Sequence, residues 1–218
     1  ESTSVAFKFA QSMASELSAV GINLDFAPCV DVLTNPKNAV IGDRSLSSDP
    51  ETVAKLASAL VRGLIKGGVI PCAKHFPGHG NTLLDSHEDL PIEEATIERL
   101  REVELVPFKK VFRARLDMVM TSHIKFPKVD ADWPVTLSEK FLQGVLRGEL
   151  RYRGLVISDD LDMKALANNF SAEQIPVRAL QAGCDILLYC NNFDKPPLAI
   201  AAINKAVKEH SLSAQRLD

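Results

Sequence analysis

The sequence is 218 residues long, with 46% hydrophobic and 24% charged residues. This composition is typical of a globular domain with one sizeable core, and it excludes a disordered or collagen-like chain. The net charge is −3 and no run of Lys or Arg exceeds a pair, which argues against nucleic acid and against an anionic membrane as partners. We therefore expect a small, weakly charged substrate.

The cysteines and the apolar runs indicate the kind of compartment. The four cysteines are scattered and mostly lie in apolar segments, which predicts free thiols in a reducing compartment. No apolar run approaches the ~20 residues of a membrane span. The start, Glu1–Ser4, has neither an initiator Met nor a signal pattern, and it does not read as a natural N-terminus.

Helical and strand-like patterns alternate along the chain. Val5, Phe9 and Met13 recur at helical spacing in the first segment, and Ile22 to Ala27 reads as a buried strand. In chain order the pattern predicts helix 4–19, strand 22–27, helix 50–66, strand 69–74, helix 93–114, strand 118–123, helix 138–150, strand 154–159, helix 172–182, strand 186–190 and helix 197–209.

This alternation of apolar strands with helices predicts an α/β fold with parallel strands. The first strand lacks the Gly-rich turn of a dinucleotide-binding sheet, which favours a (β/α)8 TIM-type barrel of about 250 residues over an open sheet. Since five strands are visible, we predict one barrel domain over 1–218 that is N-terminally incomplete and holds about the last five βα units.

Polar residues follow the strands at their carboxyl ends, the edge where barrel enzymes assemble their sites. The segment from Lys74 to His87 is the densest of these, with three His, a Lys and an Asp in a loop shaped by Pro and Gly. Asp85 and His87 are two residues apart, so in an extended segment the carboxylate can orient the imidazole. The strand ends concerned are Asp25, Lys74, His75, His123 and Asp159.

Asp159 and Asp160 end a strand in which side chains alternate, so only one of them can face the barrel mouth. A carboxylate at that place, opposite a proton donor on another loop, is the arrangement that glycoside hydrolysis needs. Asp159 could also cap the following helix, which is the structural alternative.

In combination, three segments resemble the bacterial β-N-acetylglucosaminidases of glycoside hydrolase family three. They are Lys74–Gly80 with Asp85–His87, Ser158–Met163, and Gly42–Ser45. The resemblance implies that Asp159 is the nucleophile of a retaining mechanism, that His87 is the general acid/base paired with Asp85, and that Arg44, Lys74 and His75 hold the sugar. The ordinary pKa of His, about 6.5, suits that role.

The resemblance also implies a substrate, a compartment and a missing segment. The expected substrates are muropeptides carrying N-acetylglucosamine on anhydro-muramic acid, hydrolysed during peptidoglycan recycling in the cytoplasm without a metal or organic cofactor. In the family, a further sugar-binding segment with an Asp, paired glycines and an Arg precedes the position of Ser4. The present sequence does not include that segment.

Four alternatives remain open. A β-N-acetylglucosaminide phosphorylase would use the same residues, because a neutral His does not repel phosphate. A metal-dependent barrel hydrolase would bind zinc through His75, His79, Asp85 and His87. An inactive or purely sugar-binding barrel fragment is the third. Individual residues could also be structural: Arg44 as an ion-pair partner of a nearby Asp, His79 as a loop residue, and His123 as a core-edge residue.

Overall fold

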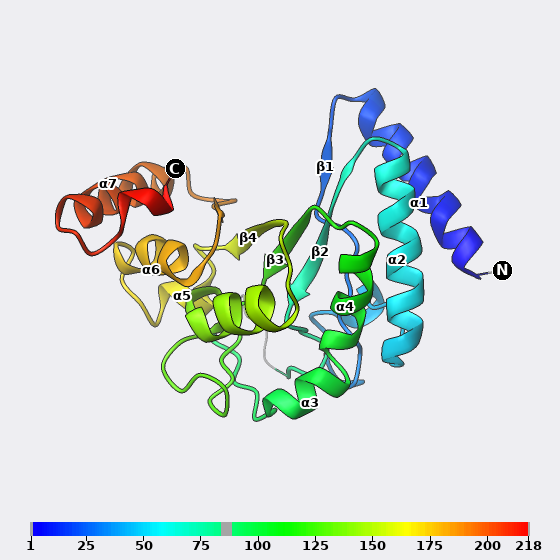
Figure 1. Cartoon of the computed structure of the whole chain (residues 1–218), viewed down its shortest axis with the longest axis horizontal. Coiled ribbons are helices and arrows are strands. Elements are labelled where there is room, and N and C mark those ends of the chain that lie inside the picture. Colours follow the sequence, from blue (N-terminus) through cyan, green and yellow to red (C-terminus); the bar gives the residue numbers. More distant parts are fainter. Residues whose placement is uncertain (1, 84–88, 218) are drawn as a thin grey trace. The chain divides into compact units, whose positions relative to one another are not determined.

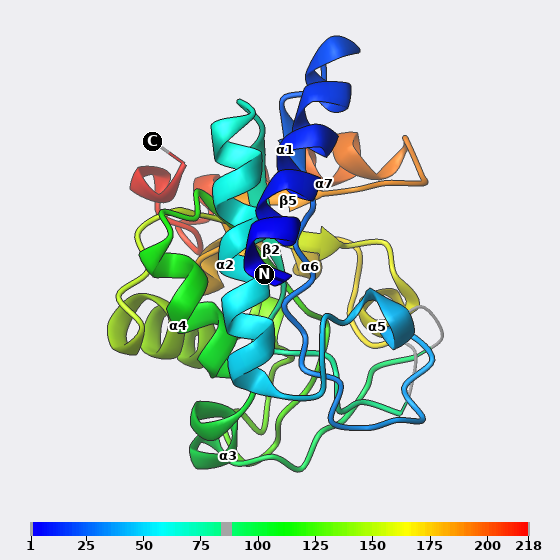
Figure 2. The same ribbon diagram turned by 90° about the vertical axis from the view of Figure 1, so that its right-hand side faces the viewer.

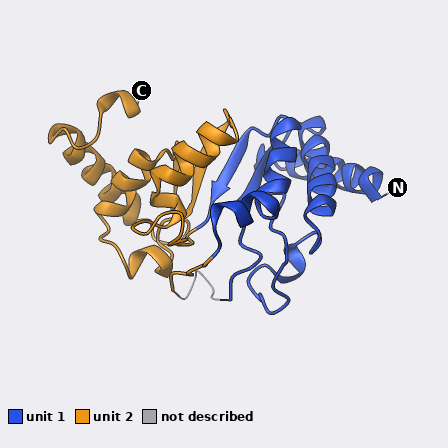
Figure 3. Ribbon diagram, turned by 60° about the horizontal axis from the view of Figure 1, so that its bottom comes forward, with its two compact units in different colours: residues 1–83, 95–122 blue, residues 84–94, 123–218 orange. Residues whose placement is uncertain are grey.

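The computed structural model describes residues 2–83 and 89–217. These form two compact units, one made of residues 2–83 and 95–122 and the other of residues 89–94 and 123–217 (Figure 3). Within the described ranges, no helix is long and apolar enough to cross a membrane.

The first unit contains three parallel strands and the helices between them (Figure 1). β1 pairs with β2 through Leu24 and Ile70, and β2 pairs with β3 through Cys72 and Met118. In chain order its elements are α1 (Ser2–Ala19), β1 (Leu24–Asp25), the 3-10 turn η1 (Gly42–Arg44), α2 (Pro50–Lys66), β2 (Ile70–Phe76), α3 (Ile97–Glu102), α4 (Leu105–Arg113) and β3 (Met118–Thr121).

Helix α2 begins and ends where its sequence signals indicate. The Asp49 side chain accepts a hydrogen bond from Thr52 N at 2.8 Å, and Pro50 occupies the first turn, where its missing N–H costs nothing. The helix ends at Gly67. The next residue, Gly68, has a φ of +83°, a backbone conformation that residues with a side chain rarely adopt.

Close packing of α1 on α2 depends on two glycines of α2 (Figure 2). A Cβ added at Gly63 would collide with the Phe7 carbonyl oxygen and would lie 2.7 Å from Ala10 Cβ. A Cβ added at Gly67 would collide with Ala14 Cβ. Ala10 and Ala14 are fully buried, so small residues on both helices set their separation.

We expect Gly63→Ala to lower the free energy of unfolding by roughly 1–3 kcal/mol, because overpacking outweighs the gain in helix propensity. The matched control is Gly144→Ala, since a Cβ there meets no atom within 4 Å. That variant should be neutral, or stabilising by up to ~1 kcal/mol. Urea unfolding of both variants measures the difference, and equal effects would contradict the packing account.

The second unit contains two parallel strands, with Ile157 of β4 opposite Ile186 of β5. Helices and turns surround them. In chain order the elements are the 3-10 turn η2 (Val135–Leu137), the π-helix η3 (Lys140–Glu149), β4 (Leu155–Asp160), α5 (Lys164–Ala167), α6 (Gln174–Ala182), β5 (Ile186–Leu188), α7 (Lys195–Lys208) and the 3-10 turn η4 (Ala214–Arg216).

An ion-pair network fixes the amino ends of β4 and β5. Asp185 accepts from Arg147 at 2.9 Å and from Arg216 at 3.0 Å, and it also accepts from the Val156 backbone N–H. Arg147 continues to the Gly154 carbonyl oxygen at 2.6 Å. Each guanidinium therefore joins a carboxylate to nearby backbone, a geometry that suits Arg better than Lys.

The predicted α/β class with parallel strands is confirmed in both units, and two element predictions are wrong. The single helix predicted over 93–114 is two helices, because Thr96 caps a new helix start and Val103, at φ −126° and ψ −72°, breaks the turn. The strand predicted over 22–27 pairs regularly only at Leu24–Asp25, and Ile22 is exposed.

Candidate functional site

The first unit gathers polar side chains at the carboxyl end of β2. Residues 23–30 run beside β2, with Lys74 N donating to the Pro28 carbonyl at 3.1 Å and Val30 N donating to the Lys74 carbonyl at 2.7 Å. This pairing places Asp31 beside His75. Lys74 and His75 were predicted from the sequence to be site residues, whereas Asp31 was not.

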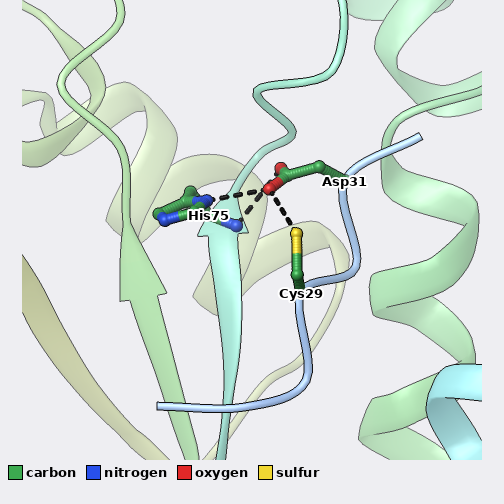
Figure 4. A group of neighbouring side chains, drawn as sticks. All are labelled: Cys29, Asp31 and His75. Carbon is green, nitrogen blue, oxygen red and sulfur yellow. Dashed lines mark hydrogen bonds and ion pairs between the residues drawn. The ribbon is translucent and has the colours of Figure 1, made fainter. Parts of the chain in front are cut away.

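The buried Asp31 carboxylate is the centre of this cluster (Figure 4). Its Oδ2 lies 2.8 Å from His75 Nδ1 and accepts from the Cys29 thiol at 3.1 Å. Its Oδ1 accepts from the backbone N–H of His75 at 3.2 Å and of His79 at 2.6 Å. Four donors therefore satisfy one fully buried carboxylate, as a buried charge requires.

The titration of the cluster follows from these contacts. Burial by itself raises the pKa of Asp31, but the charge and hydrogen bond of His75 and the charge of His79 outweigh it and hold this pKa well below its usual range. Burial and the Asp31 charge raise the pKa of the Cys29 thiol. At neutral pH the cluster thus holds a carboxylate that accepts and a thiol that donates.

Cys29, Asp31 and His75 are also three potential metal ligands whose donor atoms lie within 4.8 Å of one another. Two ligand atoms that each lie ~2.0 Å from one tetrahedral zinc would be about 3.3 Å apart. Asp31 Oδ2 and His75 Nδ1 are 2.8 Å apart, which is a hydrogen-bond distance. A metal would also need the Cys29 thiolate, which the raised pKa disfavours. The geometry fits hydrogen bonds better than a metal.

A second buried group, the Asn38 amide, ties the Arg44 segment to the loop after β2. Asn38 donates to the His79 carbonyl at 2.7 Å and accepts from Ile41 N at 2.9 Å, just before the η1 turn. Thr82 Oγ1 lies 2.6 Å from His79 Nδ1, so His79 is held by its own loop. Arg44 donates to the Val40 carbonyl at 2.7 Å.

Gly80 lies where the loop after β2 closely approaches the segment after β1. A Cβ at this position would collide with the Val32 carbonyl oxygen. The loop after β2 and the segment after β1 therefore pack backbone to backbone, which only glycine permits.

Because of Asp31, we expect the stability of the protein to fall at acidic pH. Its pKa is lower in the folded than in the unfolded protein, so its contribution is complete above the unfolded pKa of about 3.9 and is lost as the pH falls toward the folded value. We expect Asp31→Asn to reduce the pH dependence of stability below pH ~4. Thermal unfolding between pH 7 and 2.5 measures it, and an unchanged acid slope in the variant would contradict the assignment.

In the second unit the two carboxylates at the end of β4 differ in environment. Asp160 is buried, and it accepts from Asp162 N at 3.1 Å, from Cys190 N at 3.3 Å and from the Asn191 side chain at 3.1 Å. Asp159 is half-buried and accepts from Asp160 N at 2.8 Å. Asp160 is therefore committed to joining the ends of β4 and β5, and Asp159 is the more accessible carboxylate.

His123 supports the backbone at the same place. Its Nε2 lies 2.9 Å from the Asp160 carbonyl oxygen, which can only accept, so Nε2 carries a proton. Its Nδ1 lies 2.7 Å from Thr136 Oγ1, and the side chain is buried. His123 is thus a buried residue that holds the backbone of Asp160, which agrees with its structural alternative.

The structure places the predicted site residues in both units. Arg44, Lys74 and His75 lie in the first unit, and Asp159 lies in the second. Asp85 and His87 lie outside the described residues. Asp31 and Asn38 carried no motif, and the only sequence signal for Asp31 was its place just after a strand.

Comparisons with known proteins agree on one family. The model of the glycosyl hydrolase family 3 N-terminal domain matches residues 1–218. A β-hexosaminidase of Pseudomonas aeruginosa is 41% identical over 193 residues, which are 88% of this chain and 57% of that protein. The chain therefore spans little more than half the length of this curated relative.

Solved structures extend the match to the fold. A family 3 β-N-acetylglucosaminidase from Paenibacillus sp. is 40% identical, with a TM-score of 0.96 over 99% of this chain and 41% of that one. Zn-bound CbsA from Thermotoga neapolitana is 38% identical, with a TM-score of 0.94 over 100% and 47%. The β-glucoside phosphorylase BglX is 28% identical, with a TM-score of 0.93 over 99% and 40%.

Proposed function

The chain belongs to glycosyl hydrolase family 3, and we propose that it supplies the nucleophile and part of the sugar-binding site of a retaining β-N-acetylglucosaminidase. The single observation that carries this proposal is the difference in environment between Asp159 and Asp160 at the end of β4. Asp160 is buried and accepts three hydrogen bonds, while Asp159 beside it is half-buried and more exposed.

In the proposed double displacement, Asp159 attacks the anomeric carbon while the leaving oxygen takes a proton from a general acid. The product is a covalent glycosyl ester of Asp159. Water, deprotonated by the same group acting as a base, then attacks the anomeric carbon and releases the sugar and the carboxylate. The family resemblance assigns the acid/base role to His87 and the orienting role to Asp85.

The polar end of β2 is suited to holding the sugar. Lys74 is half-buried, and its ammonium needs a polar partner in a site closed by substrate. His75 is fixed by Asp31, and Arg44 lies close enough to Cys29 to act on that thiol electrostatically, although burial and Asp31 outweigh it and raise the pKa. We infer that Arg44, Lys74 and His75 hold the sugar hydroxyls.

The fold and the biological setting complete the proposal. The parallel strands of both units are proposed to belong to one (β/α)8 barrel domain, as the similarity to the family 3 structures supports. The proposed substrates are N-acetylglucosaminyl muropeptides formed in cytoplasmic peptidoglycan recycling.

We expect Asp159→Ala to lower kcat/KM for an aryl β-N-acetylglucosaminide by about 10³-fold or more, on the order of 4 kcal/mol, because the nucleophile is lost. Azide should restore turnover of this variant and give the α-configured glycosyl azide. Asp162→Ala is the control, since Asp162 is on the same segment but pairs with Lys195 at 3.3 Å. Comparable losses in both variants would exclude Asp159 as the nucleophile.

A phosphorylase is the second candidate, because BglX matches this fold closely. In this reaction phosphate replaces water in the second step, and the product is the sugar 1-phosphate. Product analysis in phosphate buffer separates the two reactions. We expect free N-acetylglucosamine, and accumulation of the 1-phosphate would favour the phosphorylase.

A metal-dependent mechanism is tested by chelation. The Zn-bound CbsA structure makes the test relevant, but this mechanism needs no metal in any step. We expect EDTA treatment followed by gel filtration to leave kcat/KM within about twofold of its starting value. Loss of activity that added Zn²⁺ restores would instead support a metal hydrolase.

A further inference from the structure

Asp31 is a buried carboxylate that contacts His75, a proposed sugar ligand, directly. We propose that Asp31 is a positioning residue: it fixes the tautomer and orientation of His75 so that Nε2 is presented to a sugar hydroxyl. This inference rests on the proposed function, because it gives Asp31 the task of orienting a residue that the proposed function assigns to sugar binding.

Two of the donors around the Asp31 carboxylate belong to His75. Oδ2 lies 2.8 Å from His75 Nδ1, and Oδ1 accepts from the backbone N–H of the same residue at 3.2 Å. One side chain therefore holds both the ring and the peptide of His75. Rotation of the imidazole would leave a buried carboxylate oxygen without its charge-assisted bond, which is costly.

Asp31 also determines which ring nitrogen of His75 carries the proton. An ionised carboxylate only accepts hydrogen bonds, so the nitrogen that faces it must carry hydrogen. The low pKa of Asp31 keeps it ionised near neutrality. Neutral His75 then has its lone pair on Nε2, and this atom can accept a hydrogen bond from a hydroxyl. An Nε2–H tautomer would lose this acceptor.

Asp31 also holds the loop after β2 in place. Its Oδ1 accepts from His79 N at 2.6 Å, and the carbonyl of His79 accepts from the Asn38 side chain at 2.7 Å. Asn38 in turn caps the turn before Arg44 through Ile41 N. One carboxylate therefore positions the proposed sugar ligands of two separate loops.

The first test uses the wild-type full-length protein and needs no variant. ¹⁵N NMR of the histidine rings near pH 7.5 reports which nitrogen carries the proton. We expect the neutral His75 ring to be protonated on Nδ1, assigned by loss of its signals in His75→Gln. A ring that carries hydrogen on Nε2, whether alone or together with Nδ1, would overturn the inference, because Nε2 could then not accept from a hydroxyl.

The second test is Asp31→Asn, which keeps an oxygen for the backbone N–H groups but presents an amide donor to His75 Nδ1. We expect His75 to switch to the Nε2–H tautomer and KM for an aryl β-N-acetylglucosaminide to rise on the order of 10- to 100-fold, a loss typical of groups that orient ligands. An unchanged tautomer and KM would overturn the inference.

Asp130→Asn is the matched control for stability. Asp130 is also a buried carboxylate with a lowered pKa, and it accepts from Asp132 N at 3.1 Å and from Ser138 Oγ. Its contacts within the described part of the chain include none of the proposed site residues. It should lower Tm without raising KM. A similar rise in KM in this control would reduce Asp31 to a structural role and overturn the inference.

The outcomes separate this inference from the proposed function. If the wild-type protein cleaves no β-N-acetylglucosaminide, the proposed function fails, and with it the proposal that His75 binds a sugar. If the wild-type protein is active but His75 carries its proton on Nε2, the inference alone fails.

Discussion

The fully buried Asp31 carboxylate is the constraint on which the first unit depends. A charge at this depth is tolerated only because four donors meet it, and each comes from a segment that needs a fixed place: the chain after β1, the end of β2 and the loop beyond it. The same contacts that satisfy the charge therefore orient the groups proposed to hold a sugar.

The second unit uses a carboxylate in the same way at the end of β4. Asp160 accepts from three groups that follow β4 and β5, and His123 donates to its backbone carbonyl. Its neighbour Asp159 is left accessible by this arrangement. In both units a buried aspartate holds the backbone next to a residue that we propose takes part in the site.

The sequence was informative where local rules apply and silent where tertiary contacts decide. Periodicity and the paired glycines after Lys66 predicted the observed bounds of α2. Strand alternation indicated that only one of Asp159 and Asp160 can face the proposed site. The break at Val103 was missed although its signal, the Thr96 cap, is local. The importance of Asp31 was missed because its contacts are with residues distant in the chain. Asp85 and His87 remain predictions, since they lie outside the described residues.

The central claim is that Asp159 forms a covalent bond to the sugar. The most direct measurement is mass spectrometry of the full-length protein after reaction with a fluorinated N-acetylglucosaminyl donor that slows the second step. The account predicts one added glycosyl group per chain, located by peptide mapping on Asp159 and released on incubation with water. Absence of any adduct during turnover, or an adduct on another residue, would contradict it.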